Sequence, residues 1–555
     1  MDPILALPEP PRDANIAHWL RDEVRARPEQ AAVIWPRGAR WSSLSFAALD
    51  ERSDALARGL RARGLRAGER ACVFLRPGGD FVAAIHALFK LGAIPVLIDP
   101  GMGRASLLAC VERAAPRALI AVGRAQLARR LWPRAFRSVE LCVSSAPLGL
   151  GGVDFDALAR TPGPAFPIEP RGADELAAIL FTSGSTGPPK GVGATHGNFR
   201  AQLAALRALY AYEPGTVDAA CFPLFALFDN ALGMTSLFPP LDPSAPARCE
   251  PGLVARAIEE HGARSAFASP AVWSRIVHWA KETNTGFTAL RTVTSAGAPV
   301  PLGLVERLQR FLPDGASIHT PYGATEALPV ASIASADILG ACRAPMLEGW
   351  GTPLGRAAPG IDLRVIRIGD AAIELWSDEL EVPRGAIGEL VVRGPVVTRG
   401  YEDDAQATRL ARIAPADGAR GAWHRMGDLG WIDGDGRAWF CGRKSERVET
   451  EHGLLVPVAA ENPLNEVLGV RRTALIGVGA RPRQRARLLV ERSFAREGLL
   501  DELRAQPLAQ PPATAHVAAR IGPVEVELAK RMPVDARHNA KIRRDELRRE
   551  AEARA

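Results

Sequence analysis

Apolar residues along this chain alternate between two spacings. Helical spacing occurs in the segments 44–63, 81–90 and 302–311, where Phe46, Leu49, Leu56 and Leu60 mark one face of the first. Short uncharged apolar runs, typical of buried strands, lie at 71–75, 94–98 and 176–180, and the segments 291–295 and 318–320 repeat the strand–helix–strand order around 302–311. Because the two kinds of segment follow one another, the pattern predicts an α/β fold with sheets layered between helices.

The pattern changes after Gly388. Strand candidates at 389–393, 473–478 and 488–491 are set among turn-rich and charged segments, which predicts a smaller α+β unit. A chain of 555 residues also exceeds one ordinary hydrophobic core. We therefore expect an N-terminal domain of residues 1–442, a hinge at 443–446 and a C-terminal domain of residues 447–555.

The composition is that of a globular protein from a reducing compartment. The chain is 47% hydrophobic and 24% charged, and a net charge of +7 at this length does not favour nucleic-acid binding. Its seven cysteines form no metal-type cluster, and no apolar run is long enough to cross a membrane. The N-terminus also lacks the features of a secretory signal. We therefore expect a cytoplasmic protein without a transmembrane segment.

One glycine-rich segment has the chemistry of a phosphate-binding loop. Residues 181–191 read Phe-Thr-Ser-Gly-Ser-Thr-Gly-Pro-Pro-Lys-Gly and directly follow the strand candidate 176–180. Ligands in open α/β sheets bind at such strand ends, and glycine lets backbone N–H groups approach an anion. Pro189 stands where the Walker spacing needs glycine. The predicted phosphate-binding residues are Thr182, Ser183, Gly184, Ser185, Thr186, Gly187 and Lys190.

Lysine is scarce in this chain. Only six of the 69 basic residues are lysine, so a lysine within a conspicuous motif is less easily explained as a surface cation. Lys190 in the glycine-rich loop and Lys541 in Arg-His-Asn-Ala-Lys-Ile stand out for this reason. A lysine is a compact charge suited to following one oxygen. Lys281 and Lys530 are expected to be solvated surface cations.

Three further segments offer groups that suit a ligand. Residues 321–326 follow the strand candidate 318–320 and provide the aromatic ring of Tyr322, the hydroxyl of Thr325 and the carboxylate of Glu326, which suits Mg²⁺. The small residues 295–299 suit contact with a planar ring. Asp428 between two glycines suits a vicinal diol, although an aspartate in a β-turn is the commoner explanation.

The order of these motifs resembles that of the adenylate-forming enzymes, which include acyl-CoA synthetases, luciferases and adenylation domains. The resemblance covers roughly residues 40–545 and implies ATP and Mg²⁺ as cofactors and a mobile C-terminal lid. It implies that Glu326 and Thr186 hold the metal, that Thr325 contacts the α-phosphate, and that Lys541 is the catalytic lysine of the lid. The implied nucleotide-binding residues are Ser295, Ala296, Gly297, Ala298, Pro299, Tyr322, Gly323, Ala324, Asp428 and Arg443.

A closer resemblance is to the β-lactone synthetases of bacterial long-chain olefin biosynthesis. It rests on residues 222–229, 320–329, 440–444, 447–450 and 533–542. It implies that a long-chain 2-alkyl-3-hydroxy acid is activated as acyl-AMP and closed by its own 3-hydroxyl to a β-lactone, with AMP and pyrophosphate as the other products. A partner such as a β-lactone decarboxylase would then form the alkene.

Two departures from the acyl-CoA ligases argue against coenzyme A as a substrate. Those enzymes carry a histidine in the segment aligned with 222–229, whereas this chain has none between His196 and His261. Acidic Glu449 and Glu451 follow the hinge where a polyanion would otherwise bind. Ser445 at the hinge and Ala540 before the lysine also differ from the family, which bears on lid geometry.

The segment around Phe222–Asp229 supplies the candidate acyl pocket. Its residues Phe222, Phe225, Leu227 and Phe228, with Met234 and Leu237, would line an apolar pocket or else belong to ordinary core. Asp229 lies among them and is a candidate base for the 3-hydroxyl, unless it caps a turn or pairs with a buried arginine. The alternatives are a fatty acyl-CoA ligase, an amino-acid adenylation enzyme, because Phe228-Asp229 resembles its amino-group site, and an inactive scaffold.

Overall fold

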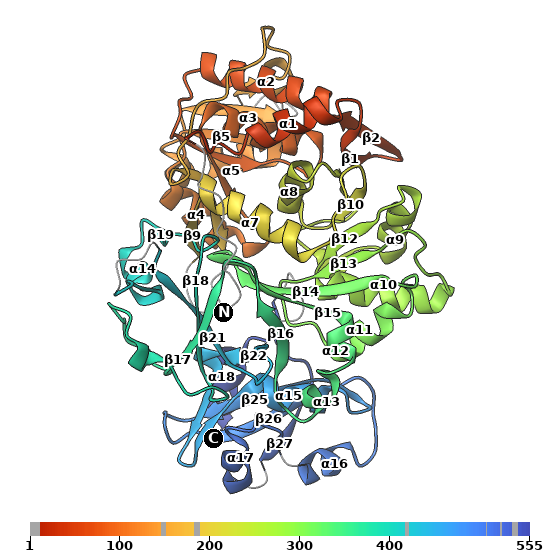
Figure 1. The fold of residues 1–555 in the computed structure, drawn as a ribbon, viewed down its shortest axis with the longest axis vertical. Coiled ribbons are helices and arrows are strands. Elements are labelled where there is room, and N and C mark those ends of the chain that lie inside the picture. The colour runs from red at the N-terminus through yellow and green to blue at the C-terminus, as the bar shows by residue number, and fades with distance from the viewer. Residues whose placement is uncertain are drawn as a thin grey trace.

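The computed structural model describes residues 12–145, 151–182, 189–416, 421–506, 508–521, 524–535 and 542–554. Over these residues the chain forms an 8-stranded sheet, a 14-stranded sheet and two small sheets, with helices packed against them. In Figure 1 the 8-stranded sheet lies at the top, the larger sheet in the middle and the C-terminal residues, in blue, at the bottom. The predicted α/β class is confirmed.

The 8-stranded sheet contains the first predicted strand–helix–strand unit. Strand β3 (Arg70–Phe74) pairs in parallel with β4 (Ile94–Ile98), and α3 (Gly79–Leu91) connects them. Helix α2 (Phe46–Ala62) packs beside α3, so Leu49, Leu56 and Leu60 join the core as their spacing predicts. Strand β8 (Leu176–Thr182) pairs with β4 and with antiparallel β9 (Lys190–Thr195). The glycine-rich segment therefore connects two neighbouring strands.

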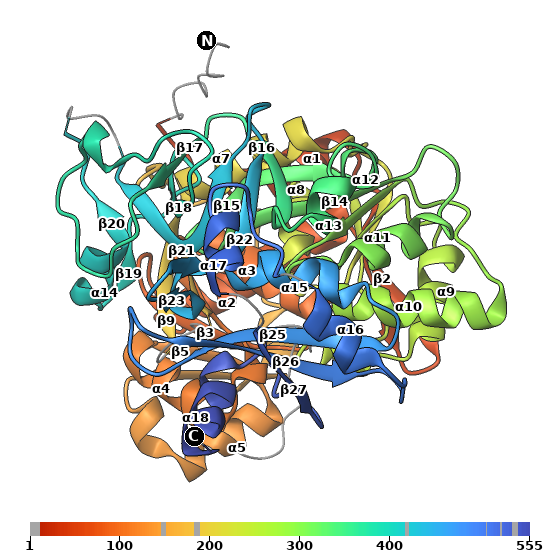
Figure 2. The same cartoon turned by 90° about the horizontal axis from the view of Figure 1, so that it is seen from below.

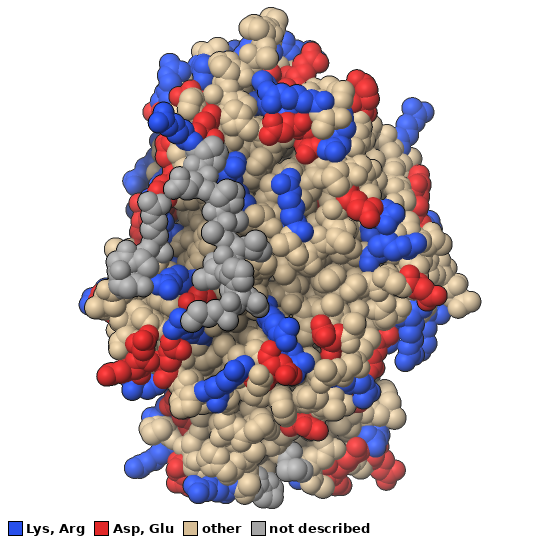
Figure 3. All heavy atoms as spheres, in the orientation of Figure 1, with Lys and Arg blue, Asp and Glu red and all other residues tan. Residues whose placement is uncertain are grey.

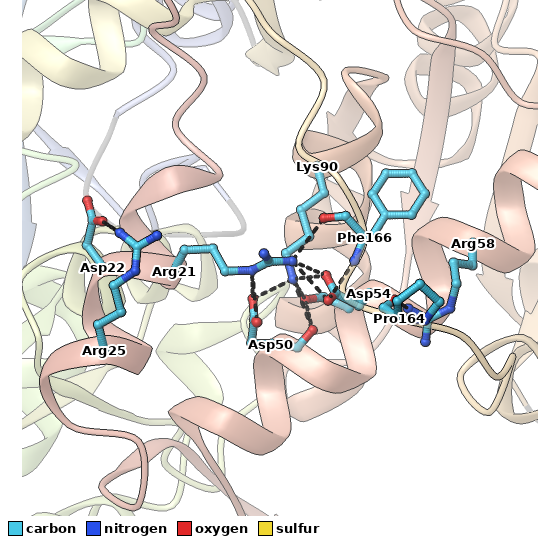
Figure 4. A network of polar contacts seen from close by, with 10 residues as sticks. Arg21, Asp22, Arg25, Asp50, Asp54, Arg58, Lys90, Pro164 and Phe166 are labelled. Carbon is cyan, nitrogen blue, oxygen red and sulfur yellow. Dashed lines mark hydrogen bonds and ion pairs between the residues drawn. The ribbon is translucent and has the colours of Figure 1, made fainter.

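A charged cluster joins three N-terminal helices (Figure 4). The Nζ atom of Lys90 on α3 lies 2.6 Å from Asp50 Oδ1 and 2.6 Å from Asp54 Oδ1, both on α2. Arg21 on α1 (His18–Ala26) donates to the same two carboxylates. Asp54 also accepts from the backbone N–H of Phe166. The cluster thus balances two cations against two carboxylates, and Lys90 is fully buried.

The 14-stranded sheet provides the strand ends around the candidate site. Its strands β11 (Thr235–Leu237), β10 (Val217–Ala220), β12 (Ser265–Ala268), β13 (Thr292–Ser295) and β14 (Ser317–Ala324) are neighbours and all parallel. Strand β15 (Ala327–Ala334) then pairs antiparallel with β14.

Two predicted motifs lie on strands: residues 321–324 at a strand end, as expected, and Asp428, for which a β-turn was the commoner explanation. Residues 321–324 continue β14, because Tyr322 pairs with Ala331 of β15 in an antiparallel ladder. Asp428 lies within β21 (Trp423–Ile432) and pairs with Arg443 at the end of β22 (Ala438–Arg443). The local turn signal came from Gly427, whose φ of 67° is accommodated inside the strand.

The C-terminal residues build a separate three-stranded sheet with its own core. Strands β25 (Val470–Val478), β26 (Arg485–Arg492) and β27 (Glu525–Ala529) contain the predicted strands 473–478 and 488–491. Figure 2 shows this sheet in front of the rest of the molecule when it is viewed from below. Its apolar cluster includes Leu475, Leu488, Val490 and Val526. No helix within the described ranges is long and apolar enough to span a membrane.

Candidate active site

A cavity of about 2180 Å³ lies at the carboxyl ends of β13 and β14 and extends between the sheet and neighbouring helices. This volume is well above the ~300–1,000 Å³ of an ordinary small-molecule site, so it has room for a nucleotide and a long acyl chain together. The lining includes the following predicted nucleotide-site residues: Lys190, Ser295, Ala296, Gly297, Ala298, Pro299, Tyr322, Gly323, Ala324, Thr325, Glu326, Asp428 and Arg443. The fold therefore brings motifs from distant parts of the chain to one site.

Asp428 is the centre of one polar group in this cavity. The phenol of Tyr322 donates to Asp428 Oδ2 at 2.7 Å, and Arg443 Nη1 donates to Oδ1 at 2.7 Å. Burial and the charge of Asp428 raise the pKa of Tyr322 well above its usual value, so the phenol stays protonated. The same charge raises the pKa of Arg443. A buried carboxylate held in this way is a rigid acceptor for the hydroxyls of a ribose.

Glu326 is the centre of a second polar group. Its Oε1 accepts a hydrogen bond of 2.7 Å from the phenol of Tyr401, which burial and the neighbouring carboxylate keep protonated by raising its pKa. Lys190 Nζ lies 4.7 Å from the centroid of the Tyr401 ring. Tyr401 is placed there because β19 (Tyr401–Glu402) pairs with β9, which begins at Lys190. Nothing in the local sequence pointed to Tyr401.

Glu326 also fits the expected magnesium ion. The described residues contain no group of three or more His, Cys, Asp or Glu side chains arranged for a metal. Mg²⁺ typically binds one or two carboxylates together with substrate phosphates, so a single carboxylate beside a phosphate-type lysine matches its needs. Thr186, the other predicted ligand, lies outside the described residues.

Several other predicted residues also lie outside the described part of the chain. Lys541, the predicted catalytic lysine, is one of them, and the side chain of Thr182 is another. The other phosphate-loop residues outside the described part of the chain are Ser183, Gly184, Ser185 and Gly187. Their roles stay predictions.

The apolar wall of the cavity contains most of the predicted acyl-pocket residues. Phe222, Phe225, Leu227 and Phe228 all line it, and Phe225 stacks on Phe267 with ring centroids 4.0 Å apart. Met234 and Leu237 do not line it. Met234 packs with Leu203, Ala231 and Leu232, and Leu237 is buried among core residues of the larger sheet, so both belong to the core instead.

Asp229 also lines the cavity, from helix α8 (Ala226–Ala231). Its Oδ2 accepts a hydrogen bond of 2.9 Å from Ser236 Oγ. Among the described residues no arginine forms an ion pair with it, and it is not the capping residue of its helix. Among the described residues, Asp229 therefore neither acts as a cap nor pairs with a buried arginine.

A buried ion cluster near the predicted hinge was not identified from the sequence. Glu389 accepts from Arg425 Nη2 at 2.6 Å and from Lys444 Nζ at 3.0 Å, and the side chains of Glu389 and Arg425 are almost fully buried. Lys444 directly follows Arg443, the partner of Asp428. The cluster fixes the start of the segment 443–446 against β18 (Gly388–Arg393) and β21.

The chain is similar to known proteins over most of its length. A family model described as "AMP-binding enzyme" matches residues 20–402. The chain belongs to this family. It is 41% identical over 550 residues, 97% of this chain and 98% of the other, to a protein of Stenotrophomonas maltophilia named olefin beta-lactone synthetase. A protein of the same name from Xanthomonas campestris pv. campestris is 40% identical over 548 residues, 96% of each chain.

Solved structures share the fold. The amide bond synthetase of Marinactinospora thermotolerans superposes with a TM-score of 0.78 at 24% identity, over 97% of this chain and 99% of that one. The o-succinylbenzoate-CoA synthetase of Bacillus subtilis, in complex with ATP and magnesium ion, gives a TM-score of 0.73 at 21% identity, over 95% and 98%. These matches confirm the α/β fold of an AMP-binding enzyme with a smaller C-terminal unit.

Proposed function

We propose that this enzyme activates a long-chain 2-alkyl-3-hydroxy acid with ATP and closes the resulting acyl-adenylate to a β-lactone. The observation that carries the proposal is that one cavity holds the Asp428 and Glu326 groups beside an apolar wall containing Asp229. The near full-length similarity to two proteins named olefin beta-lactone synthetase supports the same reading.

In the first step the substrate carboxylate attacks the α-phosphorus of ATP and expels pyrophosphate. Negative charge spreads over the phosphoryl oxygens, so the protein acts by positioning and by electrostatic stabilisation. Asp428 holds the ribose, Thr325 donates to the α-phosphate, and Lys190 and Lys541 supply positive charge. A Mg²⁺ ion held by Glu326 and Thr186 neutralises phosphate charge when bound.

In the second step the 3-hydroxyl oxygen of the same molecule attacks the activated carbonyl. The new carbon–oxygen bond closes the four-membered ring, the bond from the acyl carbon to the phosphate oxygen breaks, and AMP leaves with that electron pair. The hydroxyl proton passes to Asp229. No second substrate site is needed, because the nucleophile already belongs to the bound acid.

The structure partly neutralises the acidic pair that was expected to repel coenzyme A. Glu449 accepts a 2.6 Å hydrogen bond from Arg447, so its charge is balanced. Glu451 remains exposed, at 3.6 Å from His452. The exclusion of coenzyme A therefore rests mainly on the missing histidine in the segment 222–229.

The decisive experiment is the mass of the product formed from ATP and a 2-alkyl-3-hydroxy acid. We expect pyrophosphate release without coenzyme A and a product lighter than the acid by one water. The matched substrate without a 3-hydroxyl is expected to give adenylate but no lactone. A thioester with added coenzyme A would instead identify an acyl-CoA ligase, a preference for amino acids would identify an amino-acid adenylation enzyme, and no pyrophosphate release would identify a scaffold.

The domain arrangement belongs to the same proposal. We place the N-terminal domain at 1–442, the hinge at 443–446 and a mobile lid at 447–555. In the described arrangement Asn462 Nδ2 of the C-terminal unit donates to Thr352 Oγ1 of the larger sheet at 3.1 Å.

A cytoplasmic location and a partner that decarboxylates the lactone complete the proposal. Figure 3 shows acidic and basic side chains interspersed on one face, with no large basic patch for a nucleic acid.

Replacing Asp428 with alanine is expected to raise the KM for ATP about tenfold or more while changing kcat little. The ribose contact exists before and during the reaction, so its loss is a loss of uniform binding. Steady-state pyrophosphate release measures both constants. Asp428→Asn, which keeps the side-chain volume beside Arg443, tests whether any effect is merely structural, and exposed Asp435→Ala is the matched control. An unchanged KM for ATP in both Asp428 variants would place the ribose elsewhere.

A further inference from the structure

A second buried carboxyl group lies beside Asp229. Asp218 on β10 pairs in register with Ser236 on β11 and with Ser265 on β12, so the three side chains share one face of the sheet. Ser265 Oγ donates to Asp218 Oδ1 at 2.5 Å, while Ser236 Oγ donates to Asp229 Oδ2 at 2.9 Å. Neighbouring strands are about 4.8 Å apart, so Ser236 holds Asp229 close to Asp218.

Within the described residues, the two carboxyl groups share the cavity wall and form no ion pair with a cation. Both line the cavity, with 3% and 6% of their surface exposed, and none of the described ion pairs includes either. Tyr212 and Cys221 are close enough for the charge of Asp218 to raise the pKa of both. Other titratable and charged groups on neighbouring elements include Glu23 and Arg27, which pair with each other, His86, Lys90, Arg207, Tyr210, Cys249, Arg264 and Arg275. Two acids in a dry wall are costly, which argues that they serve a task there.

We propose that Asp218 is a positioning residue for ring closure, whose negative charge, held by Ser265, makes Asp229 a stronger proton acceptor for the 3-hydroxyl. This inference rests on the proposed lactone-forming function. Asp218 is level with Ser265 of β12, which is level with Thr292 at the start of β13. The predicted adenine loop begins at the opposite end of β13, so Asp218 lies away from that end of the sheet. It therefore acts through Asp229 and not on the reacting atoms.

The electrostatics agree with this arrangement. Burial raises the pKa of both carboxyl groups, and the charge of Asp218 raises the pKa of Asp229 further. A base whose pKa approaches the working pH accepts a proton more strongly than an ordinary carboxylate. In the step, the proton of the attacking hydroxyl moves to ionised Asp229, the ring bond forms and AMP leaves with the electron pair of the broken bond.

The test is the pH profile of lactone formation in Asp218→Asn. The wild-type rate should rise with pH as Asp229 ionises. Without the neighbouring charge Asp229 ionises more easily, so the midpoint of this rise should move to lower pH by about one unit or more, and the maximal rate should fall. Pyrophosphate release in the first turnover should stay unchanged, because adenylation does not use the pair.

Thermal stability separates this role from a structural one. An aspartate whose folded pKa is raised destabilises the fold increasingly as pH rises from its unfolded pKa through its folded pKa. Removing one of the two charges should therefore raise the melting temperature at pH 8. A structural carboxylate would give the opposite shift. Asp218→Glu, which keeps the charge, should retain the wild-type pH profile.

The outcomes distinguish the two levels of the proposal. Wild-type enzyme that releases pyrophosphate but forms no lactone would overturn the proposed function. Wild-type enzyme that forms lactone, with Asp218→Asn showing an unshifted profile or a lower melting temperature at pH 8, would overturn only the role of Asp218. Asp229→Asn should keep adenylation and lose lactone formation, and parallel loss of both would make the pair structural.

Discussion

Replacing Lys541 with alanine is expected to lower the rate of adenylate formation by about 10²–10³ while leaving ATP affinity nearly unchanged. The expectation comes from the sequence, since Lys541 lies outside the described residues. It is one of only six lysines, and it occupies the position of the catalytic lysine in the resemblance to adenylate-forming enzymes. A cation that contacts the phosphoryl oxygens mainly as charge develops contributes to the transition state and little to ground-state binding.

The measurement is single-turnover pyrophosphate release together with ATP binding by calorimetry. Lys530→Ala is the matched control, because Lys530 is exposed in the same C-terminal unit. It should behave as wild type. Strongly weakened ATP binding with normal turnover in Lys541→Ala would show that the lysine binds nucleotide and does not serve the chemical step.

The sequence predicted the fold because its signals were local. The spacing of Leu49, Leu56 and Leu60 and the apolar run of β4 need no knowledge of the rest of the chain, and both appear as expected. The β-turn offered as the commoner explanation for Asp428 was wrong for the complementary reason. Gly427 and Gly430 resemble turn signals, but pairing with β22 continues the strand. Residues 321–324 form the end of β14, as their position after an extended segment predicts.

Within the site, motif residues could be named but their partners could not. Asp428 and Arg443 were both predicted, and the register of β21 with β22 explains why they meet. Tyr401 contacts Glu326 only because a two-residue strand pairs with β9, and Asp218 meets Ser236 only through the order of parallel strands. Such pairings depend on long-range register, for which the sequence has no local signal.

The assignment of individual apolar residues failed where their direction depends on packing. Phe225 and Phe228 face the cavity, whereas Met234 and Leu237 face core clusters. All of them are apolar residues in one short segment, so composition could not separate pocket from core. The distinction needs the positions of α8 and of the sheet that follows it.

The scarcity of lysine also pointed to Lys90, whose ammonium is buried. Lys90 was placed on a predicted helix but not recognised as a buried charge. The structure places its ammonium against Asp50 and Asp54, and Arg21 donates to the same two carboxylates (Figure 4). Burial lowers the pKa of Lys90, while the two carboxylates oppose that effect and favour its charged form.

Replacing Lys90 with methionine is therefore expected to destabilise the N-terminal helices by about 3–5 kcal/mol. The substitution keeps an unbranched side chain but leaves the buried carboxylate of Asp54 and the half-buried one of Asp50 with Arg21 as their only cation in the cluster. The free energy of the first unfolding transition measures the effect, because a chain with several cores need not unfold in one step. Lys281→Met, at an exposed position, should leave that transition unchanged.

A second variant tests whether charge imbalance is the cause. Adding Asp54→Asn to Lys90→Met restores one cation against one carboxylate, so it should recover part of the lost stability. Asp54 also accepts from the backbone of Phe166, and asparagine retains an oxygen for that bond. If Lys90→Met were as stable as wild type, the cluster would be replaceable by apolar packing. If the double variant were less stable than Lys90→Met, the loss would come from broken hydrogen bonds and not from an uncompensated charge.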